Sequence, residues 1–259
     1  MKQETLKIIS ITLILILTLH LMPATPNGAS ITPGASERPD SGQASNHSAI
    51  AGNITELTIF SGDGASQTWQ GYYGNVSGGL SLGDGSNNIL YNWSLITPSG
   101  EVYASTNSSI TWVNIQCFNF SANGSYIDES GNGGTTNQYG TNITILESEY
   151  GISTTDLDGI NETFTIKNHD LFYTSNKEFS ADECRSLQLF TNETQSEDGS
   201  FEELILYEPA TRSVIFSTIL ENSKKGFNNK EVDFQMVVPE DGHDADTQTT
   251  MYFFFIEIE

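Results

Sequence analysis

Short apolar runs recur along this chain from about residue 53 and are separated by Gly, Asn, Asp, Ser and Pro. β-Branched and aromatic residues dominate these runs, which favours strands over helices. Only residues 147–157 could form a helix, and it would be short. About a dozen strands at near-regular spacing predict an all-β fold, an antiparallel β-sandwich or jelly-roll-like architecture. The sequence allows one composite unit or two docked β units.

Two hairpins are predicted from turn residues between alternating runs. Pro98 and Gly100 separate the runs 88–96 and 101–106, and Pro209 separates two runs within 201–221. In the first hairpin, Tyr91 and Trp93 alternate with polar residues. Alternation gives a strand one apolar face, so we expect both rings to lie in the core.

The last run, "TMYFFFIEIE", is apolar on both faces and predicts a central strand of its own sheet. Glu257 and Glu259 would then protect its tip against aggregation. Donation of this strand to a neighbouring subunit is the alternative.

The N-terminus has the pattern of a secretory signal, with Lys2 and Lys7 ahead of about fifteen apolar residues. We expect residues 1–29 to be a signal peptide or an uncleaved N-terminal anchor. Residues 30–52 are rich in Ser, Gly and Pro and predict a flexible leader. The folded part would comprise a first β unit over 53–150 and a second over 151–259.

The chain is strongly acidic, with a formal net charge of −23. Lys2, Lys7 and Glu4 are the charged residues of 1–29, so a chain without them keeps 8 of the 10 basic and 32 of the 33 acidic residues. Such a chain repels phosphate backbones, which argues against a nucleic-acid partner.

Two cysteines, Cys117 and Cys184, are 67 residues apart. An even count in a secreted chain predicts a disulfide between them, and two buried thiols are the alternative. The bridge would join the two β units.

Asn-X-Ser/Thr triplets are dense, and in a secreted chain they predict N-glycosylation at surface positions. The acceptors are Asn46, Asn53, Asn75, Asn92, Asn107, Asn119, Asn123, Asn142, Asn161 and Asn192.

Calcium is the one cofactor that the sequence suggests. Asp156 and Asp158 precede a glycine, and Asp244 and Asp246 have the same alternate spacing. Alternate oxygen ligands suit calcium, although the first loop lacks the closing glutamate of a calcium loop and the second lacks the glycine, and acidic surface turns are the alternative.

The sequence motifs give little support for a catalytic function. "GLSLG" over 79–83 matches the nucleophile elbow of hydrolases in spelling, but a strand follows where that elbow needs a helix. His47, His169 and His243 are the histidines that could act as its base. We therefore expect no enzyme.

The stretch "TWQGYYGNVSG" over 68–78 predicts a strand that ends in a turn carrying Asn75. Alternation places Tyr72 beside Gln70 on the polar face of this strand. Tyr72 is therefore the candidate for contact with an external sugar.

Several blocks, among them "TWQGYYGNVSG", "ITWVNIQCFNFSANGSY" and "FEELILYE", resemble a group of secreted, β-rich archaeal cell-surface proteins. The resemblance covers most of residues 68–259. It implies a non-enzymatic role in an envelope or extracellular filament, with self-assembly or contact with other cell-surface proteins. A binding or adhesion module that depends on carbohydrate or calcium is the alternative.

Overall fold

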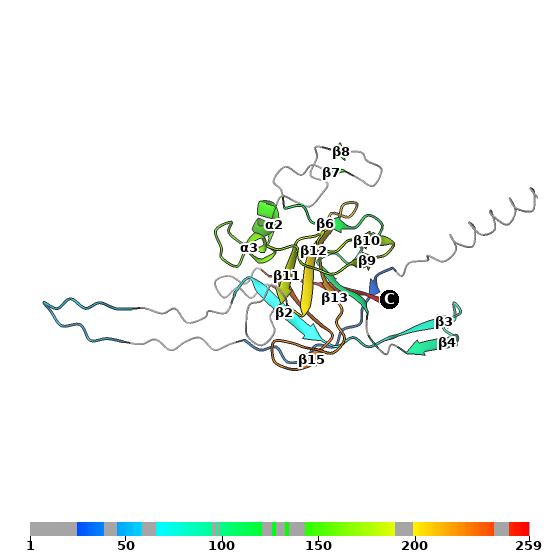
Figure 1. Cartoon of the computed structure of the whole chain (residues 1–259), viewed down its shortest axis with the longest axis horizontal. Helices are drawn as coiled ribbons and strands as arrows, with labels where there is room; N and C mark the ends of the chain where they lie inside the picture. The colour runs from blue at the N-terminus through cyan, green and yellow to red at the C-terminus, as the bar shows by residue number, and fades with distance from the viewer. Residues whose placement is uncertain are drawn as a thin grey trace, which may run out of the picture.

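The computed structural model describes residues 25–38, 46–58, 66–94, 97, 99–120, 126–127, 133–134, 143–189, 199–240 and 249–258 (Figure 1). Within these residues the chain is an all-β protein built from antiparallel sheets, as the sequence predicted. The described helices are short: α2 (Ile143–Glu149), near the helix expected at 147–157, and α3 (Ile160–Thr163).

A seven-stranded sheet forms the centre of the molecule. Its order is β1 (Asn27–Gly28), β17 (Phe253–Ile258), β5 (Gly100–Ser105), β13 (Ser213–Ile219), β12 (Phe201–Glu208) and β11 (Ser186–Leu189), with β6 (Gln116–Cys117) also paired to β12. Strands from both halves of the chain share this sheet. The boundary expected near residue 150 therefore does not separate two sheets.

The other strands form two-stranded sheets. The pairs are β2 (Trp69–Gly74) with β16 (Phe234–Pro239), β3 (Gly79–Gly83) with β4 (Ile89–Ser94), β9 (Phe172–Thr174) with β10 (Lys177–Phe179), β14 (Lys224–Lys225) with β15 (Glu231–Val232), and β7 (Tyr126–Ile127) with β8 (Gly133–Gly134).

One predicted hairpin is wrong and the other is confirmed. β4 pairs with β3, whereas β5 lies between β13 and β17 and does not pair with β4. All six residues of β5 are buried. Gly100 is the first residue of β5, and the apolar β5 takes a central position that β4 does not share. Pro98 lies outside the described residues. The hairpin of β12 and β13 forms as expected around Pro209.

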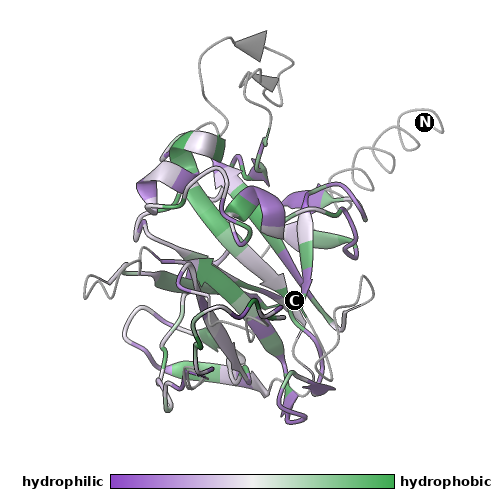
Figure 2. Ribbon diagram, turned by 90° about the vertical axis from the view of Figure 1, so that its left-hand side faces the viewer, coloured by the Kyte–Doolittle hydropathy of each residue, from purple (hydrophilic) through white to green (hydrophobic). Residues whose placement is uncertain are grey.

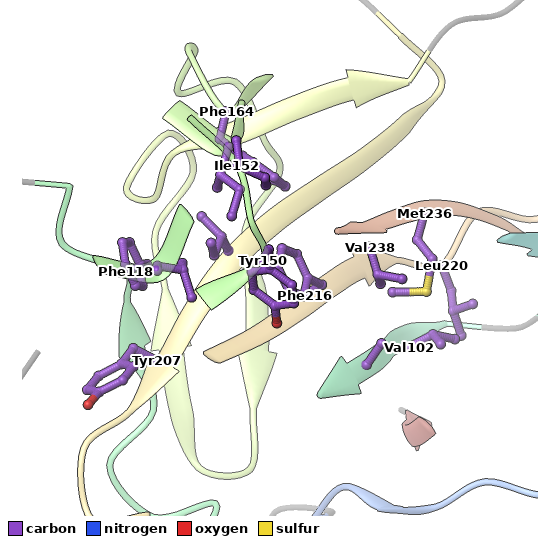
Figure 3. Close-up of a cluster of buried hydrophobic side chains, with 14 residues drawn as sticks. Val102, Phe118, Tyr150, Ile152, Phe164, Tyr207, Phe216, Leu220, Met236 and Val238 are labelled. Atoms are coloured by element: carbon purple, nitrogen blue, oxygen red, sulfur yellow. The ribbon is translucent and has the colours of Figure 1, made fainter. Parts of the chain in front are cut away.

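The central sheet is covered on both faces. On one face, β5, β12 and β13 pack against the β2–β16 pair and the α2–α3 segment through a cluster that includes Val102, Phe118, Tyr150, Ile152, Phe164, Tyr207, Phe216, Leu220, Met236 and Val238 (Figure 3). On the other face, a second cluster joins Tyr103, Leu204, Leu206, Ile215 and Phe255 to Trp112, Ile115, Phe172, Phe179 and Cys184.

Burial on both faces explains why the central strands are apolar at successive positions. Seven of the eight residues of β12 are buried, so its alternation is lost. Figure 2 shows apolar residues gathered on the strands in the middle of the molecule. The sheet therefore has the sequence pattern of an interior layer.

The carboxyl group of Glu203 lies in this interior, between β12 and β16. Glu203 is fully buried, and its Oε2 accepts a hydrogen bond from the Val237 backbone N–H at 2.8 Å. Burial raises the pKa of Glu203 well above its usual range, which favours the protonated form in the folded state. This polar contact ties the β2–β16 pair to the central sheet.

The last strand completes its own sheet, as expected. β17 pairs with β5 along all six of its residues. The expectation for Glu257 is wrong, however. Glu257 is 2% exposed and lies inside the fold, because β5 beside it and the β9–β10 turn above it close over its side chain. Glu259 lies outside the described residues.

The predicted disulfide between Cys117 and Cys184 is confirmed. Their Cα atoms are 5.1 Å apart, and Cys184 is fully buried in the second cluster. The bond joins β6 to the segment that follows the β9–β10 hairpin.

We expect replacement of both cysteines by serine to lower the free energy of unfolding by about 4 kcal/mol, because the unfolded chain loses a long closed loop. Urea denaturation of the purified protein measures this change. The matched control is the wild-type protein under reducing conditions, which should behave like the double variant. An unchanged unfolding midpoint in both would contradict a stabilising role for the bond.

Candidate functional site

The β3–β4 hairpin stands away from the sheets and pairs only with itself in the described part of the chain (Figure 1). Its turn is held by Asp84, whose carboxylate accepts hydrogen bonds from the Asn88 side chain and from the backbone N–H groups of Ser86 and Asn88. These hydrogen bonds, with that of the Asn88 side chain first, lower the pKa of Asp84. The polar turn therefore has a defined shape without support from the core.

One face of this hairpin is apolar and open. Leu82 lies opposite Tyr91, and Tyr91 and Trp93 share a face because they alternate along β4, whereas the register shift between Leu82 and Gly83 places Ile89 opposite Gly83, on the other face. The exposed fractions are 52% for Leu82, 58% for Tyr91 and 50% for Trp93. The Tyr91 and Trp93 rings meet edge to face, 4.7 Å apart.

The prediction that Tyr91 and Trp93 lie in the core is therefore wrong. Alternation identified the shared face correctly, but no described layer covers that face. We call the surface formed by Leu82, Tyr91 and Trp93 the hairpin face.

Tyr72, the candidate for a sugar contact, packs inward. Its ring lies edge-on against Phe254 at 5.2 Å, and it is partly buried against the first core cluster. Burial raises the pKa of its hydroxyl. The neighbouring Tyr73 is the exposed ring of this strand, at 45%, and it packs edge-on against Phe227 at 5.0 Å.

Several acceptor asparagines lie on the surface. Asn46, Asn53, Asn75 and Asn92 are exposed, and Asn75 occupies the loop after β2. Asn92 lies on the hairpin, on the strand face opposite Tyr91 and Trp93.

Other acceptors are partly buried: Asn107, Asn119 and Asn161. The Asn107 Nδ2 donates a hydrogen bond to the Ser213 Oγ at 2.8 Å. The Asn161 Nδ2 donates to Glu162. Asn123, Asn142 and Asn192 lie outside the described residues.

The first expected calcium loop is held by internal hydrogen bonds. The Asp156 Oδ2 accepts a bond from the Ser153 N–H, and the Asp158 Oδ2 accepts one from the Ser66 hydroxyl. The Asp158 carbonyl also accepts a hydrogen bond from the Trp69 indole N–H at 2.6 Å. These bonds attach the loop to the start of β2.

Two further carboxylates, Glu147 and Glu162, lie beside this loop, and they were not predicted from the sequence. A methyl group added to Gly159 would meet an oxygen of Glu162, one of Glu147 and the Asp156 carbonyl, all within 3.4 Å. Desolvation by burial raises the pKa of Glu147. Among the described residues, no group of three or more His, Cys, Asp or Glu side chains is arranged to hold a metal ion. Calcium stays a prediction here, and Asp244 and Asp246 lie outside the described residues.

Among the described residues, the serine of the hydrolase-like motif has no catalytic arrangement around it. Ser81 lies in the middle of β3, opposite Asn92, and not at a strand-to-helix turn. His169 is 2% exposed, and its Nε2 accepts a hydrogen bond from the Cys184 backbone N–H. This bond gives His169 a structural role beside the disulfide. His47 lies in the exposed stretch 46–58, and His243 lies outside the described residues.

A pair of buried glutamates, Glu101 and Glu257, was also not predicted from the sequence. Glu101 and Glu257 are directly opposed on β5 and β17, and each is 2% exposed. The Tyr103 hydroxyl lies 3.3 Å from Glu101 and 3.2 Å from Glu257. The Ser175 backbone N–H donates to both oxygens of Glu257. Burial, followed by the charges of both glutamates, raises the pKa of Tyr103 well above its usual range.

None of the helices in the described part of the chain is long and apolar enough to cross a membrane. Comparison with protein-family models, with curated proteins and with solved structures gave no match to this chain.

We expect Tyr103→Phe to lower the free energy of unfolding by about 1.5–3 kcal/mol, because the buried glutamates lose a hydroxyl donor. Thermal unfolding at neutral pH measures the loss. Tyr73→Phe is the matched control, since Tyr73 is 45% exposed and the same atom is removed from a solvated ring. Equal melting temperatures for the two variants would contradict the role of the buried hydroxyl.

Proposed function

We propose that this protein is a secreted, glycosylated, acidic structural component of a cell surface, in an envelope or an extracellular filament. The open hairpin face is the observation that carries the assembly role. A two-stranded hairpin alone is marginally stable in water, and an exposed apolar patch is typical of a protein–protein contact. Association with other surface subunits would cover Tyr91, Trp93 and their apolar neighbours.

Five further features support a location outside the cell. The Cys117–Cys184 bond is of the kind that forms and persists in oxidising compartments. Exposed acceptor asparagines occupy both the leader and the folded part. The acidic composition and the apolar N-terminal segment agree with this location, as does the resemblance to archaeal cell-surface proteins.

Imaging and mass spectrometry of native cell-surface material test the proposal. We expect the protein in polymeric surface material, with glycans on exposed asparagines such as Asn75 and Asn92. Asn107 is an internal comparison, because its amide nitrogen is already bonded to Ser213, so its occupancy should be lower. Recovery of a monomeric protein without glycans from the cytoplasm would contradict the proposal.

A sugar-binding role is the second candidate, and the exposed pair of Tyr91 and Trp93 favours it. Aromatic rings at a surface can stack on sugar faces, and glycans are then the partner. The two rings are inclined at 63°, so they would contact a ligand as a bent surface and not as one flat platform.

One pair of variants separates the two roles. Trp93→Ala removes an exposed ring from the hairpin face, and Ile89→Ala removes an apolar side chain of the opposite strand face, where Ile89 lies opposite Gly83 and is 63% exposed. We expect Trp93→Ala to weaken self-association at least about tenfold in analytical ultracentrifugation, as for a central interface aromatic. Ile89→Ala should have little effect.

Affinity electrophoresis through gels containing a soluble β-glucan or a mannan tests the sugar-binding role, because binding retards the protein. Retardation of the wild type that is lost only in Trp93→Ala, with self-association unchanged, would favour the second candidate. Equal behaviour of the two variants in both assays would remove the hairpin face from either role.

A further inference from the structure

The outer edge of β17 is only partly covered. β5 pairs with all six residues of β17, but on the other side β1 pairs with just Phe255 and Ile256. One more bond runs from the Ala29 backbone N–H to the Phe254 carbonyl at 2.9 Å. Next to this short ladder is a hollow of about 330 Å³, lined by Gly28, Ala29, Ile31, Ser108 and Tyr252–Phe255. The edge therefore has room for strand pairing beyond the contact that β1 makes.

The segment that covers this edge has one buried residue among 25–29. Pro26 is buried and Ala29 is partly buried, whereas Asn27 and Gly28 are exposed. These residues belong to the segment 1–29 that the sequence reading treated as a signal peptide or anchor. They persist in the mature protein as β1 if cleavage occurs ahead of residue 25, or if the segment stays as an uncleaved anchor.

The described parts of the connection from β1 to β2, residues 30–38 and 46–58, do not pack the segment against its own copy. Every described residue of 30–38 and of 46–58 is exposed. The stretch 46–58 lies far from the sheets (Figure 1). Fully extended, residues 29–68 would reach about 130 Å, which is much more than a small domain's diameter. The chain is therefore long enough to place β1 on a neighbouring molecule.

Exchange between copies would preserve every contact of the ladder. The same Asn27–Ile256 and Gly28–Phe255 pairs form whether β1 comes from its own chain or from another. The balance between the two arrangements then depends on the long connection and on protein concentration, as in domain swapping. High local concentration on a cell surface favours exchange.

We propose that residues 25–29 add as an edge strand to β17 of a second copy of this protein. The inference rests on the proposed role in a surface assembly and names the contact that would build it. The segment and the edge are different surfaces, so each copy donates one strand and accepts one. A contact of this head-to-tail type gives an open chain of subunits unless two copies exchange reciprocally. The β1 segment, and not the C-terminal strand β17, is then the donated strand.

Cysteine cross-linking between two single variants tests the exchange. Asn27→Cys and Ile256→Cys place thiols at facing ladder positions, and the native cysteines are already bonded to each other. The two full-length variants are secreted together and oxidised under assembly conditions. A bond between positions 27 and 256, identified by mass spectrometry, must join two chains. We expect such cross-linked dimers.

The double variant carrying both substitutions should give a ladder of covalent oligomers on non-reducing gels. Asn53→Cys mixed with Ile256→Cys is the matched control, because Asn53 is exposed and outside the ladder. An internally bridged monomer at all concentrations, with no 27–256 bond in the mixture, would overturn the inference. Cross-linking in the control as strong as in the test pair would overturn it as well.

A second variant avoids any change to the core. Asn27→Pro removes a backbone donor from an exposed ladder position. We expect assembly to be lost while the melting temperature of the monomer stays within a few degrees of the wild type. Polymers formed normally by Asn27→Pro would refute strand exchange and leave the proposed surface role intact. Absence of the wild-type protein from the cell surface would instead refute the proposed function.

Discussion

Burial of the central sheet on both faces is the constraint on which the rest of this structure depends. β5, β12 and β13 pack against the β2–β16 pair on one side and the β9–β10 hairpin on the other. Polar groups buried on these strands cannot reach bulk water, so a hydrogen-bond partner inside the protein lowers the cost of burying them. The Val237 N–H donates a hydrogen bond to Glu203. The Tyr103 hydroxyl and the Ser175 N–H are the donors for the opposed pair of glutamates, Glu101 and Glu257. The buried acids thus join the layers.

The sequence predicted the features that depend on local pattern. Short apolar runs with turn residues predicted the strands, and the hairpin around Pro209 formed because its two runs are adjacent and both apolar. The disulfide followed from an even cysteine count. The pairing of β4 failed because turn residues show where a chain changes direction, not which strand each run will join. Which strands pair depends on how all the apolar runs are buried together, and in this fold β5 takes a central position.

The candidate site could be predicted only in part. Alternation placed Tyr91 and Trp93 on one face, yet whether a second layer covers that face depends on distant segments. Tyr72 was assigned to the solvent because it follows Gln70 by two residues, but β16 turns that face toward the core through Met236. The Glu101–Glu257 pair has no local signal, since its members meet only when β5 and β17 align. The exposure of Asn75, in contrast, could be predicted, because the glycines around it indicate a turn.

The Cys117–Cys184 bond also has a topological consequence. It converts the chain between these residues, with α2, α3 and the β9–β10 hairpin, into a covalently closed ring. One proteolytic cut anywhere within that ring leaves both fragments attached to each other. A protease would have to cut the ring twice to release a piece of it, unless the disulfide is first reduced. The molecule can therefore be nicked in its middle section and remain one particle.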